Sequence, residues 1–158
     1  MIVMHVENEP IWREAFQRQL GVQGGRLGSC DYLATGFVDE AEKRLQAGSI
    51  RAMVLDIGLN VDWDNRHMIA VLRNLTLDEV LANPSHSMQC HAHRLSRLAH
   101  AQGVPAVLLT NYADYTGGDP PLTRERLQEI FQVEAVFGKD EKDMHQCATW
   151  LRRILELQ

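Results

Sequence analysis

Five short apolar runs, separated by longer segments of mixed polarity, form the main pattern of the chain. They are Ile2–Val6, Tyr32–Phe37, Ile50–Ile57, Pro105–Thr110 and Glu134–Phe137. Apolar runs of this length that end at turn-forming residues predict buried β-strands. The third run is the most apolar of the first three.

The segments between these runs carry apolar residues at helical spacing. They predict helices at Ile11–Leu20, Asp39–Ala47, Asp64–Leu75, His91–Ala101 and Glu141–Leu157. Pro10 suits the first turn of the first of these helices, and Gly48 suits the end of the second. Strands that alternate with helices predict βαβ units and a parallel sheet. We therefore expect an α/β, flavodoxin-like, doubly wound sheet of five parallel strands.

The connection between the third and fourth predicted strands is longer than one crossover needs. It contains two helical stretches, and Asn83-Pro84-Ser85 interrupts the part between them. We expect an extra helical insertion at about residues 60–89, in one domain that spans residues 1–158. Our hypothesis is that this insertion shapes a partner surface beside the functional edge of the sheet.

Composition narrows the class of protein. The 158 residues are 45% hydrophobic and 23% charged, with a formal net charge of −5. These values indicate an ordinary globular protein and argue against a general nucleic-acid binder. No apolar run approaches the roughly 20 residues that span a bilayer, and no signal-peptide pattern opens the chain. Three scattered cysteines favour reduced thiols, so we expect a soluble, cytoplasmic protein without a membrane contact.

Three polar residues close predicted strands: Asp56, Thr110 and Lys139. The carboxyl ends of parallel strands meet at one edge of the sheet, where open α/β sheets place their ligand sites. The carboxylate can take up a phosphoryl group or hold a metal, and the hydroxyl and the amine can bind phosphoryl oxygens. Each residue also has a structural interpretation, such as a cap or an exposed strand end.

Four segments resemble the receiver domain of two-component response regulators. Val6–Pro10 is similar to the acidic segment after the first strand, and Val54–Ile57 to the phosphoacceptor segment. Val104–Thr110 is similar to the fourth strand with its switch hydroxyl, and Val136–Asp140 to the segment that carries the family's lysine. The resemblance covers most of the chain outside the expected insertion.

The resemblance implies that Asp56 accepts a phosphoryl group from a histidine kinase, a phosphotransfer protein or a small donor. Thr110 and Lys139 would bind the phosphoryl oxygens, and the chain would be a signalling module and not an enzyme. Output would come from docking to a downstream protein or from formation of a homodimer. The resemblance also implies a Mg²⁺ site whose ligands come from Glu7, Asn8, Asp56 and Gly58.

Two alternatives stay open from the same residues. Asn8 and Asn111 stand where receivers have an aspartate and a small residue, which favours a pseudo-receiver that binds partners without phosphorylation. The order Asp56, Thr110, Lys139 also resembles haloacid-dehalogenase phosphohydrolases, although Asp56-Ile57-Gly58 lacks their second aspartate. Glu7 and Glu9 are equally typical of acids in the first turn of a helix.

Two further groups of residues stand out. His86, Cys90, His91 and His93 gather in and after the expected insertion, where a polar helix face and a soft-metal site such as Zn²⁺ are the two interpretations. No familiar zinc spacing supports the metal. We expect Trp12, Trp63 and Trp150 to be packing residues; Trp63, with polar neighbours, is also a candidate partner contact.

Overall fold

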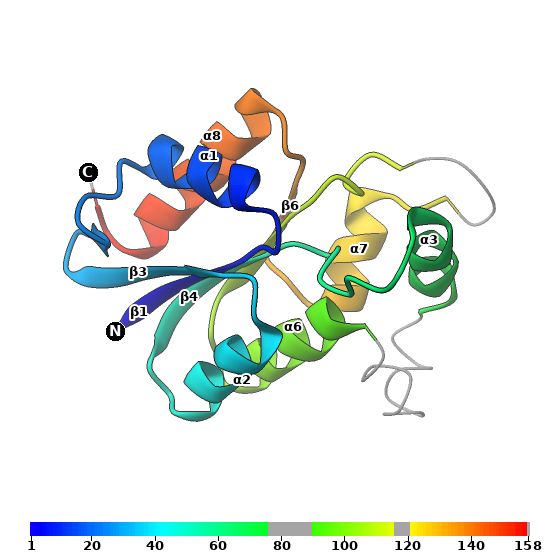
Figure 1. Ribbon diagram of the computed structural model, residues 1–158, viewed down its shortest axis with the longest axis horizontal. Coiled ribbons are helices and arrows are strands. Elements are labelled where there is room, and N and C mark those ends of the chain that lie inside the picture. Colours follow the sequence, from blue (N-terminus) through cyan, green and yellow to red (C-terminus); the bar gives the residue numbers. More distant parts are fainter. Residues whose placement is uncertain (76–89, 116–120, 158) are drawn as a thin grey trace.

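The computed structural model describes residues 1–75, 90–115 and 121–157 (Figure 1). Its strands are β1 (Ile2–Val6), β2 (Arg26–Leu27), β3 (Cys30–Thr35), β4 (Ile50–Leu55), β5 (Ala106–Leu109) and β6 (Val136–Phe137). Its helices are α1 (Pro10–Leu20), α2 (Val38–Gln46), α3 (Asn65–Asn74), α6 (His91–Ala101), α7 (Arg124–Phe131) and α8 (Glu141–Ile154). The predicted α/β, doubly wound architecture is therefore confirmed.

The six strands form one sheet in the order β2-β3-β1-β4-β5-β6. All neighbouring pairs are parallel except β2 and β3, which are antiparallel. The predicted count of five strands was wrong, because β2 adds a sixth. The missed strand has only two residues inside a glycine-rich segment, so it has no apolar run to reveal it.

Alternation along the strands separates two cores. Val3 on β1 and Val54 on β4 face one side, where α1 and α8 cover the sheet and bring Phe16 and Leu151 into contact with it. Met4 and Leu55 face the other side, which α2, α6 and α7 cover (Figure 1). Side chains of successive strand residues point to opposite faces, so one apolar strand serves both cores.

Helix boundaries follow local capping chemistry. Asp64 accepts the His67 N–H at 2.7 Å and begins α3, and Thr123 accepts the Arg126 N–H at 3.1 Å and begins α7. Gly21 ends α1 in the left-handed conformation at φ 69°, which glycine adopts without steric cost. No helix is predicted between the fourth and fifth expected strands, where the structure has α7.

Helix α3 lies within the expected insertion of residues 60–89, of which residues 76–89 are outside the described residues. Met68 and Leu72 of α3 are buried in the core that includes α6 and α7. Arg126 of α7 donates through Nη2 to the carbonyls of Arg73 and Leu75, at 3.3 and 3.4 Å. The helix is thus fixed against α7 at its C-terminal end.

No helix in the described part of the chain is both long and apolar enough to cross a membrane. Cys30, Cys90 and Cys147 are all buried and all free. The buried thiols agree with the expectation that the cysteines do not form a disulfide framework.

Candidate functional site

The three strand-end residues lie together at the carboxyl edge of the sheet. Asp56 follows β4, Thr110 follows β5 and Lys139 comes two residues after β6. Backbone bonds extend the ladder to these positions: the Asp56 N–H donates to Val6 at 3.0 Å, and the Thr110 N–H to Phe137 at 2.9 Å. Asp56 is 5% exposed, Thr110 is fully buried and Lys139 is 7% exposed. The edge therefore holds a buried carboxylate, hydroxyl and ammonium within one site.

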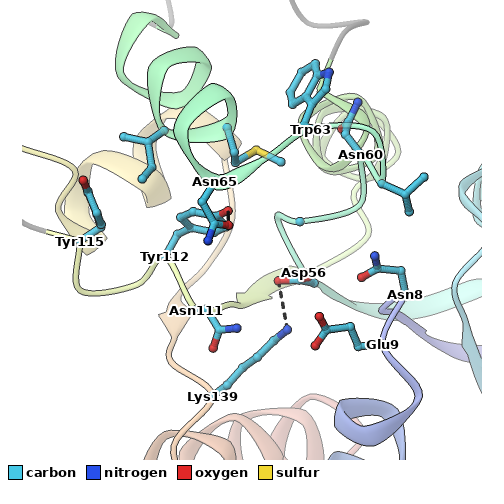
Figure 2. Close-up of a pocket in the computed structure, with 14 residues that line it drawn as sticks. Asn8, Glu9, Asp56, Asn60, Trp63, Asn65, Asn111, Tyr112, Tyr115 and Lys139 are labelled. Carbon is cyan, nitrogen blue, oxygen red and sulfur yellow. Dashed lines mark hydrogen bonds and ion pairs between the residues drawn. The ribbon is translucent and has the colours of Figure 1, made fainter.

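Lys139 joins two carboxylates. Its Nζ lies 2.6 Å from Glu7 Oε2 and 3.4 Å from Asp56 Oδ1 (Figure 2). The same Nζ lies 5.4 Å from the centroid of the Trp12 ring, within the range of a cation–π contact. A buried charge is costly unless it is paired, so the ammonium and the two carboxylates stabilise one another.

Burial shifts the protonation of both acids. It raises the pKa of Glu7 to about 6; the charge of Asp56 adds to this rise, and Lys139 opposes it. Burial also raises the pKa of Asp56, while Lys139, the Gly58 N–H and the Thr110 hydroxyl oppose that rise. Lys139 thus acts as the counter-ion that favours the carboxylate form needed for a nucleophile or a metal ligand.

The loop after Asp56 approaches its carboxylate closely. A Cβ atom on Gly58 would lie 3.1 Å from Asp56 Oδ2, so a larger residue would press on the carboxylate. Two residues on, Asn60 is buried and its Oδ1 accepts the His91 N–H at 2.9 Å. This contact fixes the loop to the start of α6, and no pattern in the sequence predicts it.

A cavity of about 370 Å³ opens over Asp56 and Lys139 (Figure 2). Asn8 and Glu9 line it beside β1, and Asn111 and Tyr112 line it after β5. The outer wall comes from α3 and the residues before it. The wall residues are Asn60, Val61, Trp63, Asn65, Met68 and Ile69. The expected insertion therefore contributes one side of the site.

Tyr112 connects the Thr110 strand end to that outer wall. Its backbone N–H donates to Thr110 Oγ1 at 3.3 Å, and its hydroxyl donates to Asn65 Oδ1 at 2.7 Å. Asn65 is the first residue of α3. The Thr110 hydroxyl is therefore connected through Tyr112 to the start of α3.

The donors in the cavity are oxygen atoms, which hard cations such as Mg²⁺ prefer. Asp56 and Glu9 offer carboxylates and Asn8 an amide oxygen, and Gly58 also lines the cavity. Glu7 Oε1 accepts the Glu9 N–H at 2.9 Å and Oε2 contacts Lys139, so both its oxygens are engaged. Among the described residues, no group of three or more His, Cys, Asp or Glu could hold a metal. Of the four residues that the resemblance implied, Asn8, Asp56 and Gly58 line the cavity, while Glu7 is engaged by Lys139 and the Glu9 N–H.

Of the predicted group of His86, Cys90, His91 and His93, the first lies outside the described residues. Cys90 is buried and its pKa is raised to about 11 by burial, which favours the neutral thiol. His93 is also buried, donates through Nε2 to Ile130 O at 3.0 Å and packs edge-on against Phe131. Both are core residues in the described structure.

The tryptophans occupy three different settings. Trp150 is buried and donates through Nε1 to Glu134 Oε2 at 2.9 Å. Trp63 is half-buried, packs against the core and lies edge-on to His67, with ring centroids 4.8 Å apart. Trp12 contacts Lys139, a position beside the site that spacing alone had not indicated.

No protein-family model matches the chain, and no curated protein matches it. Solved structures do match. The receiver domain of the TMAO respiratory system response regulator TorR is 15% identical, with a TM-score of 0.58 over 98% of this chain and 96% of that chain. A response regulator receiver protein from Pseudoalteromonas atlantica is 10% identical, with a TM-score of 0.57 over 99% and 98%.

A de novo designed Rossmann 2x3 fold protein also matches, at 9% identity and a TM-score of 0.52 over 96% of this chain and 88% of that chain. A designed scaffold and natural receivers thus resemble the chain to a similar degree. At these identities the likeness shows the fold alone: the chain has the flavodoxin-like architecture of receiver domains.

Proposed function

We propose that this chain is a receiver module that accepts a phosphoryl group on Asp56 and passes the signal on by binding another protein. The observation that carries the proposal is the position of Lys139 Nζ, 3.4 Å from Asp56 Oδ1 at the mouth of a polar cavity. A cation beside a buried carboxylate can hold the oxygens of an incoming phosphoryl group. The receiver-like fold adds support at the level of architecture.

In this proposal an Asp56 oxygen attacks phosphorus while the bond to the donor group breaks. Acetate leaves acetyl phosphate with the bonding electron pair, or an imidazole leaves phosphohistidine and takes a proton. Lys139 binds one phosphoryl oxygen and the Thr110 hydroxyl donates to another. Mg²⁺ bound by Asp56, Glu9 and Asn8 would offset the negative charge that gathers there.

The partners in this proposal are a histidine kinase or phosphotransfer protein as donor and a downstream protein as target. The proposal gives the chain no turnover of its own beyond slow loss of the phosphoryl group. A homodimer is a second mode of output, and the proposed setting is cytoplasmic. In this proposal the cavity wall from α3 is a surface that a partner protein can contact.

A pseudo-receiver is the second candidate, and one distance favours it. Lys139 is 0.8 Å closer to Glu7 than to Asp56, from the distances of 2.6 and 3.4 Å, so the ammonium is already neutralised by a residue other than the acceptor. Asn8 also lowers the number of carboxylates in the cavity. Such a module would bind its partner in the unmodified state.

Intact mass after incubation with acetyl phosphate and Mg²⁺ tests the two candidates. The receiver predicts a gain of one phosphoryl group that Asp56→Asn abolishes and Asp39→Asn keeps; Asp39 is an exposed acid in the first turn of α2. No gain with acetyl phosphate or with a kinase mixture would favour the pseudo-receiver. Repeated turnover of a generic phosphate ester would favour the phosphohydrolase alternative instead.

A further inference from the structure

The position of Lys139 depends on a short loop. Lys139 lies between β6, a strand of two residues, and α8, which begins at Glu141. The sequence has only three lysines, Lys43, Lys139 and Lys142, and of these only Lys139 is buried. Gly138, directly before Lys139, is buried, so its backbone N–H needs a hydrogen-bond partner within the protein.

Asp143 provides that contact from the first turn of α8. Its Oδ2 accepts the Gly138 N–H at 2.7 Å, directly before Lys139, and the residue is 7% exposed. Its own N–H donates to Asp140 Oδ1 at 2.9 Å, which caps the helix. A carboxylate that accepts a backbone N–H in a buried setting fixes the peptide that it binds.

Arg124, the first residue of α7, holds Asp143 from the other side. Its Nη2 lies 2.7 Å from Asp143 Oδ2. The same guanidinium binds Asp114 with two bonds, Nε to Oδ1 at 2.9 Å and Nη2 to Oδ2 at 2.7 Å. The bonds to Asp114, with those to Asp143, raise the pKa of Arg124. Asp114 lies four residues after Thr110, so one guanidinium joins the loops that carry Thr110 and Lys139.

Close packing around Gly138 is a second indication that the peptide before Lys139 is held in place. A Cβ atom there would lie 3.1 Å from Asp143 Oδ2, 3.3 Å from Asp140 Oδ2 and 3.6 Å from Arg124 Nη2. The distances to Asp143 and Asp140 are shorter than ordinary contacts, so a side chain at position 138 would press on both carboxylates. Asp143 therefore binds the Gly138 peptide in a buried setting, and its ion pair with Arg124 is not a contact between two exposed charges.

We propose that Arg124 and Asp143 are positioning residues for Lys139, which fix its ammonium between Glu7 and Asp56 by holding the Gly138 peptide. Neither residue touches the carboxylate of Asp56. Their effect on phosphoryl transfer rests on the proposed function above, but their effect on Lys139 does not. The two effects can therefore be measured separately.

The first measurement is the side-chain ammonium signal of Lys139 in ¹⁵N-labelled protein, assigned by its loss in Lys139→Met. Lys43 and Lys142 are exposed, so their protons exchange with water and leave a simple spectrum. We expect one protected signal in the unaltered chain. Asp143→Ala and Arg124→Ala should each change its chemical shift or broaden its line. Asp140→Ala, which removes the helix cap and keeps both contacts to Asp143 Oδ2, should leave the signal in place.

The outcomes are decisive in both directions. An unchanged Lys139 signal in folded Asp143→Ala and Arg124→Ala, or no protected signal in the unaltered chain, overturns the proposal. Arg124 is more exposed than Asp143, so Arg124→Ala keeps the test open if Asp143→Ala fails to fold. With acetyl phosphate, both variants should gain mass about tenfold more slowly. This change in rate corresponds to a barrier that is about 1.4 kcal/mol higher. No mass gain in the unaltered chain rejects the phosphoryl proposal and leaves the ammonium signal to decide the positioning role.

Discussion

Lys139 is paired more closely with Glu7 than with Asp56: its Nζ lies 2.6 Å from Glu7 Oε2 and 3.4 Å from Asp56 Oδ1. Glu7 is fully buried, and its second oxygen accepts the Glu9 N–H. The residue that anchors the ammonium is therefore not the one proposed to react. Phosphorylation would place new negative charge on the weaker of the two contacts and draw the ammonium toward Asp56.

Glu7→Gln should change how stability depends on pH. The pKa of Glu7 is raised to about 6 in the folded chain, so the folded state binds more protons than the unfolded state between pH 4.5 and 6. The free energy of unfolding therefore contains a contribution that is present at low pH and lost as pH rises through 6. It amounts to at most about 2 kcal/mol for this shift.

Urea unfolding from pH 4.5 to 7.5 measures this contribution. The unaltered chain should lose stability relative to Glu7→Gln across the interval, so the difference between the two curves should slope. Glu14→Gln on α1 is the control, since Glu14 is exposed. Parallel curves for Glu7→Gln and the unaltered chain would contradict the assigned shift.

Two buried histidines, His5 and His93, should make the free energy of unfolding fall as pH falls, opposite to the effect of Glu7. Burial lowers the pKa of His5 to about 3 and that of His93 to about 4. Between those values and 6.5 the unfolded chain binds the extra protons, so stability is lost as pH falls. His93→Gln should remove up to about 3 kcal/mol of this dependence between pH 6.5 and 4.

Denaturant unfolding of His93→Gln beside His100→Gln checks the prediction. His100 is exposed on the same helix, so its replacement should leave the slope with pH unchanged. Glutamine at position 93 can still donate to Ile130 O, so the variant and the unaltered chain both have this buried hydrogen bond. Equal pH slopes in the two variants would be inconsistent with a neutral, buried His93.

Tyr112→Phe should loosen the start of α3 and little else. The substitution removes the 2.7 Å bond from the Tyr112 hydroxyl to Asn65 Oδ1 and keeps the ring. A hydrogen bond of this kind contributes about 0.5–1.5 kcal/mol. Amide hydrogen exchange of residues 65–74 should rise severalfold in Tyr112→Phe, with smaller changes in β1 and β4.

Tyr115→Phe is the matched variant, because that ring lies 5.3 Å from the Arg73 guanidinium and remains after the change. Exchange in α3 should stay near that of the unaltered chain. If Tyr115→Phe and Tyr112→Phe raised exchange to the same extent, the Asn65 bond would not be the link between the two segments.

Asn8→Asp should strengthen binding of Mg²⁺. The change adds a third carboxylate to Asp56 and Glu9 around the cavity, and hard cations bind oxygen sites more tightly as ligand charge rises. We expect about a tenfold lower Kd by calorimetry, on the scale by which ligand charge tunes such sites. Asn74→Asp makes the same change on the exposed end of α3 and should leave the Kd unaltered.

The apolar pattern predicts both the parallel strands and the meeting of Asp56, Thr110 and Lys139, because both follow from the geometry of a parallel sheet. Buried parallel strands need apolar runs, and polar residues at their carboxyl ends meet at one edge. Each of the three residues closes a predicted strand, so their meeting is predicted although they are far apart in the chain. The boundaries moved by about two residues at β3, predicted as 32–37 and observed as Cys30–Thr35.

Other parts of the site leave no trace in a pattern. Arg124 and Asp143 are 19 positions apart, from their numbers in the sequence, and no spacing rule links an arginine to a carboxylate across a strand and a loop. Asn60 is buried by a contact to the His91 N–H that depends on tertiary packing. Helix α7 is different, because its buried Leu127, Ile130 and Phe131 stand at helical spacing and do leave a pattern that predicts a helix.

The sheet ends on both sides in a strand of two residues, β2 and β6. The outer rim of a sheet carries unpaired N–H and C=O groups, on which a strand of another molecule can add and begin aggregation. Two residues offer too short a template for such addition, and at β2 the ion pair of Arg26 with Asp31 adds charge there. β2 and β6 are therefore poorly suited to the addition of a further strand, whereas residues 32–35 of β3 extend beyond the two residues with which β2 pairs.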